Sequence, residues 1–245
     1  MVFQECLITT KMKNKKQLIL GDGLLGAEIR KQTGWDYVSR KKNGVDFTDI
    51  RSYREFITEY DEIVNCIGYT NTYDKNRKKH WDINYKGVYN LARLCNLLNK
   101  KLIHISTDYV YSNSVPNASE EDVPVHCRNW YGYTKLLSDG VIQLMSNDYL
   151  IIRTSFKEKP CTHSKGWMIQ GNFDYVDVIS ENIVKVIKTD VKGIYNIGTD
   201  KKTLFELGKQ TNQEIEPTTE YIDESVPEDV SMNLNKMESL KYENN

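Results

Sequence analysis

Residues 17–31 read QLILGDGLLGAEIRK, and this stretch carries the strongest evidence on the fold. Its first four residues form an apolar run typical of a buried strand, and its last eight are typical of a helix. In a loop between a strand and a helix, Gly21 permits a tight turn, Gly23 lets the backbone approach a pyrophosphate, and Gly26 lets the helix pack closely on the strand. The helix N-terminus would supply amide donors and a positive dipole end to the phosphates. We therefore predict a dinucleotide-binding loop here; an ordinary glycine turn is the alternative.

Strands and helices alternate along the rest of the chain. Further strands are predicted at Trp35–Ser39, Glu62–Cys66, Leu102–Ile105, Tyr149–Arg153 and Gly193–Ile197, and helices at Thr48–Glu59, His80–Asn99, Tyr131–Met145, Val176–Lys188 and Leu204–Gln210. This alternation indicates an α/β fold, a Rossmann-type doubly wound parallel sheet with helices on both faces. The alternation weakens after residue 155, which predicts a small C-terminal substrate-binding cap over the carboxyl ends of the strands.

The chain is accordingly divided into three parts. Residues 1–16 are predicted to be a basic N-terminal extension. Residues 17–155 are predicted to form an NAD(P)-binding Rossmann core. Residues 156–245 are predicted to form a mixed region that completes the sheet and supplies the small substrate cap.

The overall composition excludes several classes of partner. The chain has 245 residues, with 33 Lys and Arg against 34 Asp and Glu, so no net field would steer it to nucleic acid or to a membrane surface. No apolar run approaches the ~20 residues of a membrane helix, and the first ten residues do not resemble a signal peptide. The five cysteines and four histidines are dispersed, which favours free thiols in a reducing cytoplasm and no metal site. We expect a cytoplasmic protein.

Three side chains of complementary chemistry follow later in the predicted core. Thr107 lies in a Ser-Thr-Asp tripeptide at the end of a predicted strand, and Tyr131 and Lys135 are one turn apart on a predicted helix. A free tyrosine has a pKa near ~10, and an adjacent ammonium lowers it by stabilising the phenolate. Thr107 would orient a substrate oxygen, Tyr131 would give it a proton as hydride arrives at carbon, and Lys135 would bind the nicotinamide ribose. The pattern predicts an oxidoreductase; a surface tyrosine beside a solvated lysine is the alternative.

The end of the second predicted strand bears on the choice of cofactor. An acidic residue there binds the ribose 2′-hydroxyl of NAD, whereas a basic one favours the 2′-phosphate of NADP. The strand runs into Ser39-Arg40-Lys41-Lys42, and the first acid after it is Asp46. This order favours NADP over NAD, with a solvated basic turn as the alternative. Asp46 could instead meet the adenine from the side.

Several further motifs, taken together, resemble those of one enzyme family. They are Ile63–Thr70 (IVNCIGYT), Asn84, His104–Tyr111 (HISTDYVY), Glu121–Pro124 (EDVP), Asn129–Gly132 (NWYG) and Ile152–Ser155 (IRTS), the last followed by Phe156 where the family usually has Trp. The chain resembles the extended short-chain dehydrogenases, and within them the dTDP-4-dehydrorhamnose reductase (RmlD-like) family. The resemblance is strongest over residues 17–155.

The residue patterns and the resemblance together imply a set of site residues. The cofactor-binding residues are expected to be Gly21, Gly23, Leu24, Leu25, Gly26, Arg40, Asp46, Ile67, Gly68, Tyr69 and Lys135. The substrate-binding residues are expected to be Thr107, Asp108, Tyr109, Tyr131 and Phe156, and the catalytic residues Thr107, Tyr131 and Lys135.

The resemblance implies an NAD(P)H-dependent reductase of a nucleotide-linked 4-keto-6-deoxysugar, of the kind used in dTDP-rhamnose biosynthesis. Its partner would be the nucleotide-sugar substrate, and a homodimer is one state it could adopt. Two alternatives remain open. One is a non-catalytic, nucleotide-binding partner subunit on the same fold, and the other is a related sugar-nucleotide epimerase or dehydratase.

Overall fold

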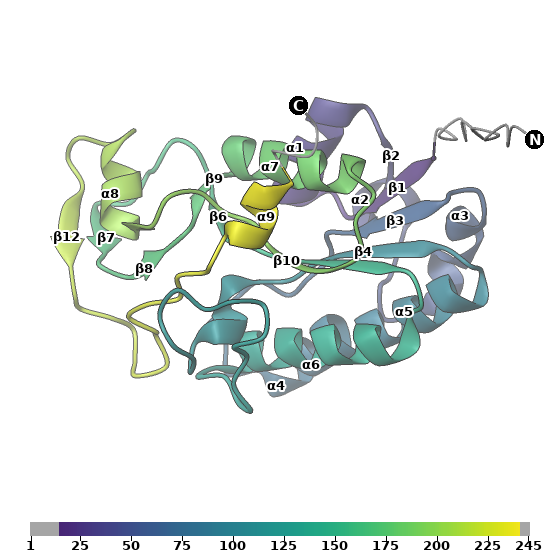
Figure 1. Ribbon diagram of the computed structural model, residues 1–245, viewed down its shortest axis with the longest axis horizontal. Coiled ribbons are helices and arrows are strands. Elements are labelled where there is room, and N and C mark those ends of the chain that lie inside the picture. Colours follow the sequence, from purple (N-terminus) through teal and green to yellow (C-terminus); the bar gives the residue numbers. More distant parts are fainter. Residues whose placement is uncertain (1–14, 241–245) are drawn as a thin grey trace, which may run out of the picture.

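The computed structural model describes residues 15–240 and shows helices on both faces of a parallel sheet (Figure 1). Within this part of the chain, six parallel strands pair in the order β10-β5-β4-β3-β1-β2. Their bounds are β1 (Gln17–Leu20), β2 (Asp36–Val38), β3 (Glu62–Asn65), β4 (Lys101–Ile105), β5 (Tyr149–Arg153) and β10 (Gly193–Asn196). The order steps away from β1 in both directions, as a doubly wound sheet requires. The predicted fold class is confirmed, while most of the predicted extension 1–16 lies outside the described residues.

Both faces of the sheet are buried, which explains why its strands are almost continuously apolar. Successive side chains of a strand point to opposite faces. Ile19 and Ile103 therefore join the hydrophobic cluster under α1 (Leu24–Thr33) and α7 (Val176–Lys188), whereas Leu18 and Leu102 join the cluster under α5 (Val88–Leu97) and α6 (Trp130–Met145). The main helices are α1 (Leu24–Thr33), α2 (Arg40–Asn43), α3 (Arg54–Thr58), α4 (Arg77–Lys79), α5 (Val88–Leu97), α6 (Trp130–Met145), α7 (Val176–Lys188), α8 (Leu204–Lys209) and α9 (Asn235–Ser239).

The helix predicted at His80–Asn99 is interrupted in a way that matters for the site. It begins as α4, continues as the π-helix η2 (His80–Gly87) and becomes regular only in α5. Within η2, the Asn84 amide accepts a hydrogen bond from Tyr69 N at 2.7 Å and donates one to Tyr69 O at 3.1 Å. A π-helix holds an extra residue in its turn, and here that turn presents Asn84 to the loop after β3.

The helix predicted from Thr48 to Glu59 is also divided. A 3-10 turn, η1 (Ile50–Ser52), is followed by α3, and between them Tyr53 adopts φ −133°. The Tyr53 side chain is fully buried and lies 5.8 Å, centroid to centroid, from the Phe47 ring. The break therefore accompanies the burial of an aromatic side chain that a continuous helix pattern does not reveal.

The C-terminal part of the chain forms a smaller lobe beyond the carboxyl end of β5 (Figure 1). Short strands pair there as β6 (Phe156–Lys157) with β9 (Asp174–Tyr175), β7 (Lys165–Trp167) with β12 (Glu216–Thr218), and β8 (Gln170–Gly171) with β11 (Lys202–Thr203). The weak alternation after residue 155 thus reflects strands of only two or three residues. Helix α9, which the sequence did not indicate, packs against β10 through Met237.

Candidate active site

The loop between β1 and α1 has the geometry that its glycines predict. Gly21 adopts φ +100°, and a Cβ there would lie 2.9 Å from the Ile67 side chain. A Cβ on Gly26 would lie 2.2 Å from the Gly21 carbonyl oxygen. Gly23 precedes α1 with φ −66°, and an added Cβ there would meet nothing within 4 Å among the described atoms. Gly21 and Gly26 are therefore needed for the shape of the loop, while Gly23 faces open space.

The N-terminus of α1 is free to bind an anion. No side chain in the described chain caps it, so its first backbone N–H groups retain unused hydrogen-bonding capacity. Leu24 at this end is exposed, while Leu25 is buried in the core. Of the two predicted cofactor-binding leucines, the structure leaves Leu24 accessible and uses Leu25 for packing.

The basic turn after β2 forms the short helix α2, capped by Ser39, whose hydroxyl accepts from Lys42 N at 3.1 Å. Lys42 Nζ and Arg30 Cζ each lie 4.1 Å from the centroid of the Tyr37 ring. The exposed Arg40 contributes a positive charge that lowers the pKa of Asp46, although hydrogen bonds from Thr48 have the larger effect. Asp46 accepts from Thr48 N and Oγ1, so its carboxylate is engaged within its own turn.

The segment after β3 lies beside the glycine loop. Ile67 packs against Gly21, and its backbone N–H donates to Asn65 Oδ1 at 3.1 Å. The Asn84 side chain holds Tyr69 through hydrogen bonds to its backbone N–H and C=O groups. Gly68 lies between the anchored residues Ile67 and Tyr69. The structure thus brings Ile67, Gly68 and Tyr69 to the same edge of the sheet as the glycine loop.

The ends of β4 and α6 bring Thr107 and Tyr131 together. The Thr107 hydroxyl lies near the half-buried Tyr131 phenol and acts to lower its pKa. It also donates to Asp108 Oδ1 at 3.1 Å and accepts from Tyr109 N at 3.2 Å, which begins the 3-10 turn η3 (Asp108–Tyr111). Desolvation raises the pKa of Tyr131 to about 12, outweighing the opposite effect of Thr107, and the charge of Asp108 raises it too. Tyr131 is therefore a protonated phenol at neutral pH.

Lys135 lies one turn further along α6, but its amine points into the protein. Lys135 Nζ lies 2.6 Å from Ile105 O and 3.0 Å from His104 Nε2. Burial lowers the pKa of Lys135 to about 8, against the opposing charge of Asp139. In this structure the hydrogen bonds of the Lys135 amine go to β4, whereas the Tyr131 phenol lies near Thr107.

Asp108 is the most unusual of the predicted substrate-binding residues. Its side chain is fully buried, and Oδ2 has no hydrogen-bond partner among the described residues. Burial raises the pKa of Asp108 to about 6, and the nearby Lys157 opposes this rise. Lys157, on β6, was not anticipated because no motif marks it. Phe156, beside it, is half-buried against the cluster under α1 and α7.

Tyr109 belongs to a wall of aromatic rings. Its hydroxyl hydrogen-bonds to that of Tyr73, and its ring lies 6.2 Å, centroid to centroid, from Tyr131. Tyr73 in turn lies 5.9 Å from the Trp167 ring, in the C-terminal lobe. Tyr73 reaches the site through tertiary contacts with Tyr109 and Trp167, which are distant from it in the sequence. No sequence motif therefore indicates that Tyr73 belongs to the site.

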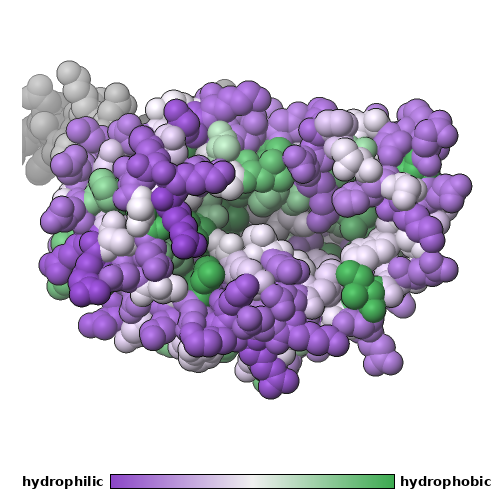
Figure 2. All heavy atoms as spheres, turned by 180° about the vertical axis from the view of Figure 1, so that it is seen from behind, coloured by the Kyte–Doolittle hydropathy of each residue, from purple (hydrophilic) through white to green (hydrophobic). Residues whose placement is uncertain are grey.

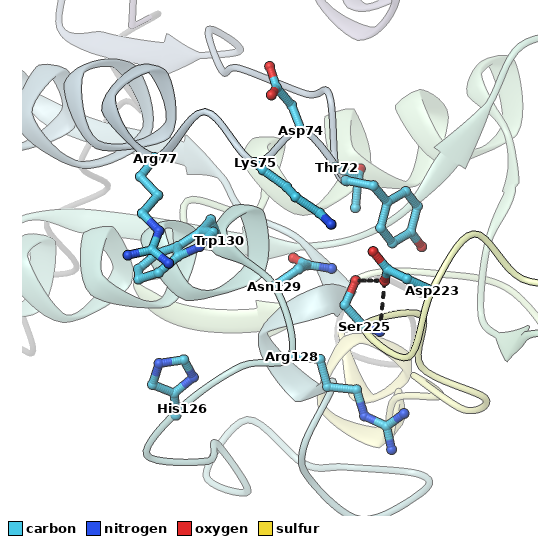
Figure 3. Close-up of a pocket in the computed structure, with 11 residues that line it drawn as sticks. Thr72, Asp74, Lys75, Arg77, His126, Arg128, Asn129, Trp130, Asp223 and Ser225 are labelled. Carbon is cyan, nitrogen blue, oxygen red and sulfur yellow. Dashed lines mark hydrogen bonds between the residues drawn. The ribbon is translucent and has the colours of Figure 1, made fainter.

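Two cavities open beside this wall. One, of about 350 Å³, includes Tyr73 in its lining, and in Figure 3 the Lys75 and Asn129 side chains extend into it. Over the same cavity, the Arg77 guanidinium lies 4.5 Å from the Trp130 ring centroid. The other cavity, of about 390 Å³, lies in the C-terminal lobe and is lined in part by Lys157. Figure 2 shows the rear face hollowed near its middle, with hydrophobic atoms at the floor and polar atoms at the rim.

The described residues also bear on metal binding, thiols and membrane insertion. Within residues 15–240, no group of three or more His, Cys, Asp or Glu side chains could hold a metal ion. Cys66, Cys95, Cys127 and Cys161 are free thiols, and Cys6 lies outside the described residues. In the same range, every helix is too short or too polar to cross a bilayer.

Curated proteins are similar to this chain over part of its length. The chain is 33% identical over 149 residues to the spore coat polysaccharide biosynthesis protein SpsK of Bacillus subtilis, covering 58% of this chain and 53% of that protein. It is 30% identical over 144 residues to a dTDP-4-dehydrorhamnose reductase of Mycolicibacterium smegmatis, covering 55% and 43%. The chain thus spans about half the length of the curated relatives it matches.

Solved structures show the same fold over more of the chain. The dTDP-4-dehydrorhamnose reductase of Bacillus anthracis, solved in complex with NADP, superposes with a TM-score of 0.78 at 23% identity, covering 93% of both chains. The profile of the RmlD substrate binding domain matches residues 15–157, more than half of this chain. The chain therefore belongs to the RmlD substrate binding domain family.

Proposed function

We propose that this protein is an NAD(P)H-dependent reductase of a nucleotide-linked 4-keto-6-deoxysugar, with Tyr131 as its general acid. The observation that carries this proposal is a protonated Tyr131 phenol beside Thr107 at the carboxyl end of β4. Ligands bind at the carboxyl ends of the strands in this architecture. Relatives named dTDP-4-dehydrorhamnose reductase support the substrate class.

The glycine loop fits a dinucleotide. The open space at Gly23 and the uncapped N-terminus of α1 would receive the pyrophosphate, because backbone N–H groups there point outward. The exposed cation Arg40, at the end of β2, would favour the 2′-phosphate of NADP over NAD. The Bacillus anthracis relative was solved with NADP, which supports the same preference. When bound, the nicotinamide would supply a hydride.

The residues of this chain would manage the proton. Reduction of a ketone creates an alkoxide, and a neutral phenol within hydrogen-bond reach protonates it. The raised pKa of Tyr131 keeps the proton on the phenol at neutral pH, which is the form a reductase needs. Thr107 would orient the substrate oxygen toward Tyr131, and Asp108, with a free carboxylate oxygen, would accept from a sugar hydroxyl. Tyr109 and Phe156 would form the walls of the sugar site.

The C-terminal lobe, within the predicted region 156–245, would serve as the substrate cap. Its cavity of about 390 Å³ adjoins Lys157, whose charge acts on Asp108. A nucleotide-linked sugar is long enough to need space on both sides of the reacting carbon. The four free thiols in the described chain are in keeping with the cytoplasmic location that we propose.

The experiment is turnover of 4-keto-6-deoxy nucleotide sugars with NADPH or NADH, followed by cofactor absorbance and product analysis. We expect cofactor oxidation with the purified chain, a loss of turnover in Tyr131→Phe, and near-normal turnover in Tyr133→Phe. Tyr133 is the matched control because it lies on the same helix but stacks on His126, away from Thr107. Cofactor binding without turnover of any nucleotide sugar would overturn the reductase and favour a non-catalytic partner subunit.

A related dehydratase is the second candidate, for one reason. The chain is 26% identical over 215 residues to bovine dTDP-D-glucose 4,6-dehydratase, which covers 71% of this chain. Dehydration or epimerisation returns the hydride to the sugar, so neither consumes NADPH. Product formation without net cofactor oxidation would therefore identify this alternative.

A further inference from the structure

The π-helix η2 holds the loop after β3 at two points. Two of its side chains, His80 and Asn84, lie four residues apart, and both are fully buried. Asn84 binds the backbone N–H and C=O groups of Tyr69 at the start of the loop. His80 Nε2 lies 2.9 Å from the backbone oxygen of Asp74 at the end of the loop. The loop 69–74 is therefore attached to η2 at both ends.

The contact with Asp74 defines the state of the His80 ring. A backbone carbonyl oxygen only accepts hydrogen bonds, so His80 Nε2 must carry a hydrogen. Burial lowers the pKa of His80, outweighing the opposite effect of Asp74, so the ring is neutral at neutral pH. His80 Nδ1 is then an acceptor, and it faces the Asn84 amide nitrogen, a donor, at 3.5 Å. Both ring nitrogens are thus engaged within the protein.

The two ends of the loop are also joined to each other. The Tyr69 hydroxyl donates to Asp74 Oδ2, while Asp74 Oδ1 accepts from Asn76 N at 2.8 Å. Asp74 N donates to Asn71 O at 3.1 Å. Figure 3 shows the Asp74 side chain directed away from the cavity of about 350 Å³. Asp74 therefore serves the shape of the loop, and the tip of the loop is the part that can face a ligand.

Tyr73, at this tip, connects the core with the C-terminal lobe. Its hydroxyl hydrogen-bonds to the Tyr109 hydroxyl, and its ring lies 5.9 Å, centroid to centroid, from the Trp167 ring. The Tyr109 ring lies in turn 6.2 Å from the Tyr131 ring. Tyr73 also lines the cavity of about 350 Å³. A shift of the loop would therefore move the wall between the proposed acid and this cavity.

We propose that His80 is a positioning residue that fixes Tyr73 in the wall of the substrate site. Its effect on turnover rests on the reductase function proposed above, whereas its effect on the loop does not. His80 is buried beneath the loop, so it acts on a ligand only through the loop. Without its hydrogen bond, the Asp74 end of the loop would move more freely, and a nucleotide sugar would meet a less ordered wall. The proton transfer proposed for Tyr131 would change little.

The His80 ring has other contacts that a test must separate from the hydrogen bond. Its centroid lies 4.9 Å from that of Tyr69 and 6.4 Å from that of Tyr131. The substitutions His80→Gln and His80→Asn both remove the ring and leave an amide. The Gln amide nitrogen reaches about as far as imidazole Nε2, whereas Asn is one methylene shorter and does not reach Asp74 O. The two variants therefore differ in the hydrogen bond to Asp74.

The first test is amide hydrogen exchange of the full chain by NMR, without cofactor or substrate. The N–H groups of Tyr69 and Asp74 are hydrogen-bonded in the attached loop. We expect both to exchange about fivefold faster or more in His80→Asn, and within about twofold of the wild type in His80→Gln. Lys78→Ala, on the exposed side of α4, is the control that should exchange like the wild type. Unchanged exchange in His80→Asn would overturn the proposal.

The second test is steady-state kinetics with the accepted nucleotide sugar. We expect KM to rise about fivefold in His80→Asn and kcat to stay within about twofold, while His80→Gln keeps a KM near that of the wild type. Tyr73→Leu removes the wall residue and should also raise KM. Adding His80→Asn to Tyr73→Leu should raise KM little further, because both changes act on the same wall. A merely structural role would lower kcat through loss of folded protein and leave KM unchanged.

A third measurement needs no substitution of His80, should His80→Asn not fold. Nitrogen-15 NMR of the wild-type chain with labelled histidine distinguishes the two neutral tautomers from the imidazolium. The His80 signal is assigned by elimination with single substitutions of the other histidines. We expect a neutral ring with its hydrogen on Nε2. A hydrogen on Nδ1 would overturn the proposal, because the contact with Asp74 would then not be a hydrogen bond.

The outcomes separate this inference from the proposed function. Faster exchange in His80→Asn without turnover of any nucleotide sugar would refute the reductase and leave the attachment of the loop intact. Turnover with equal KM values in His80→Gln and His80→Asn would refute the role of the hydrogen bond. Additive effects of His80→Asn and Tyr73→Leu on KM would show that His80 does not act through Tyr73, which would also refute the proposal.

Discussion

Gly26 lies so close to Gly21 that a Cβ on Gly26 would fall 2.2 Å from the Gly21 carbonyl oxygen. We therefore expect Gly26→Ala to displace α1 from the loop and to lower the free energy of unfolding by about 1–3 kcal/mol. Chemical denaturation measures the change. A variant as stable as the wild type would contradict the close contact between these two glycines.

Gly23→Ala should behave differently, because an added Cβ meets no described atom within 4 Å and the backbone φ of −66° suits any residue. We expect its stability to stay within about 0.5 kcal/mol of the wild type. Its dissociation constant for NADPH should nevertheless rise about tenfold or more, because the methyl group would occupy the proposed pyrophosphate position. Calorimetric titration of both glycine variants with NADPH separates folding from binding, and unchanged NADPH affinity would refute this position for the pyrophosphate.

Tyr131→Phe removes the proposed acid while keeping the ring. Loss of a general acid typically lowers the rate by about 10²–10⁴-fold, so kcat should fall by that factor while NADPH binding changes little. Single-turnover kinetics with the accepted nucleotide sugar measures the chemical step. Equal losses in Tyr131→Phe and Tyr133→Phe would remove the reason to assign the proton to Tyr131.

Asp108 should leave a signature in the pH dependence of stability. Its pKa is about 6 in the folded protein against 3.8 as the ordinary value, so the folded state holds the proton more tightly than the unfolded state. The free energy of unfolding should therefore fall as pH rises from about 4 to about 6. Asp108→Asn should remove this contribution and be more stable than the wild type at pH 7. Denaturation curves across this pH range check the sign. The control is a substitution of an exposed residue, Asp122→Asn, in which the free energy of unfolding should still fall as the pH rises.

The buried pair of Asp139 and Arg153 should be costly to break. Both side chains are at most 2% exposed, and Arg153 Nε lies 2.9 Å from Asp139 Oδ2. Removing one partner leaves an uncompensated buried charge, so Asp139→Ala should destabilise the protein by about 3–5 kcal/mol. The exposed pair of Lys159 and Asp177 provides the comparison, since Asp177→Ala should cost about 1 kcal/mol or less. Similar losses in the two variants would contradict this reasoning.

Much of the fold could be predicted because burial on both faces leaves a clear pattern. Strands such as Leu102–Ile105 are runs of the expected length that are apolar except for one residue, and the helix that begins near Tyr131 has a regular spacing. The interruption at η2 could not be predicted, since it depends on hydrogen bonds between Asn84 and Tyr69. The two-residue strands of the C-terminal lobe are too short to carry a period.

The candidate site likewise has features that the sequence predicts and features that only tertiary contacts determine. The spacing of Thr107, Tyr131 and Lys135 follows from one strand end and one helix, so their neighbourhood could be inferred, although their roles stay predictions. The direction of the Lys135 amine could not be inferred, because it depends on His104, a residue that reads as part of an ordinary buried strand. Lys157 carries no motif and meets Asp108 only through tertiary packing.

The π-helix η2 also determines which insertions and deletions this protein can tolerate. The wide turn holds a residue more than a regular helix, so deleting one residue within His80–Gly87 would close it to an α-helix and leave α4 and α5 in phase. Val88 and Leu91 would stay against the sheet, but Asn84 would lose the Tyr69 backbone. Substitutions on the outer face of this segment leave its phase unchanged. Natural variation here should therefore appear in residue type and rarely in length.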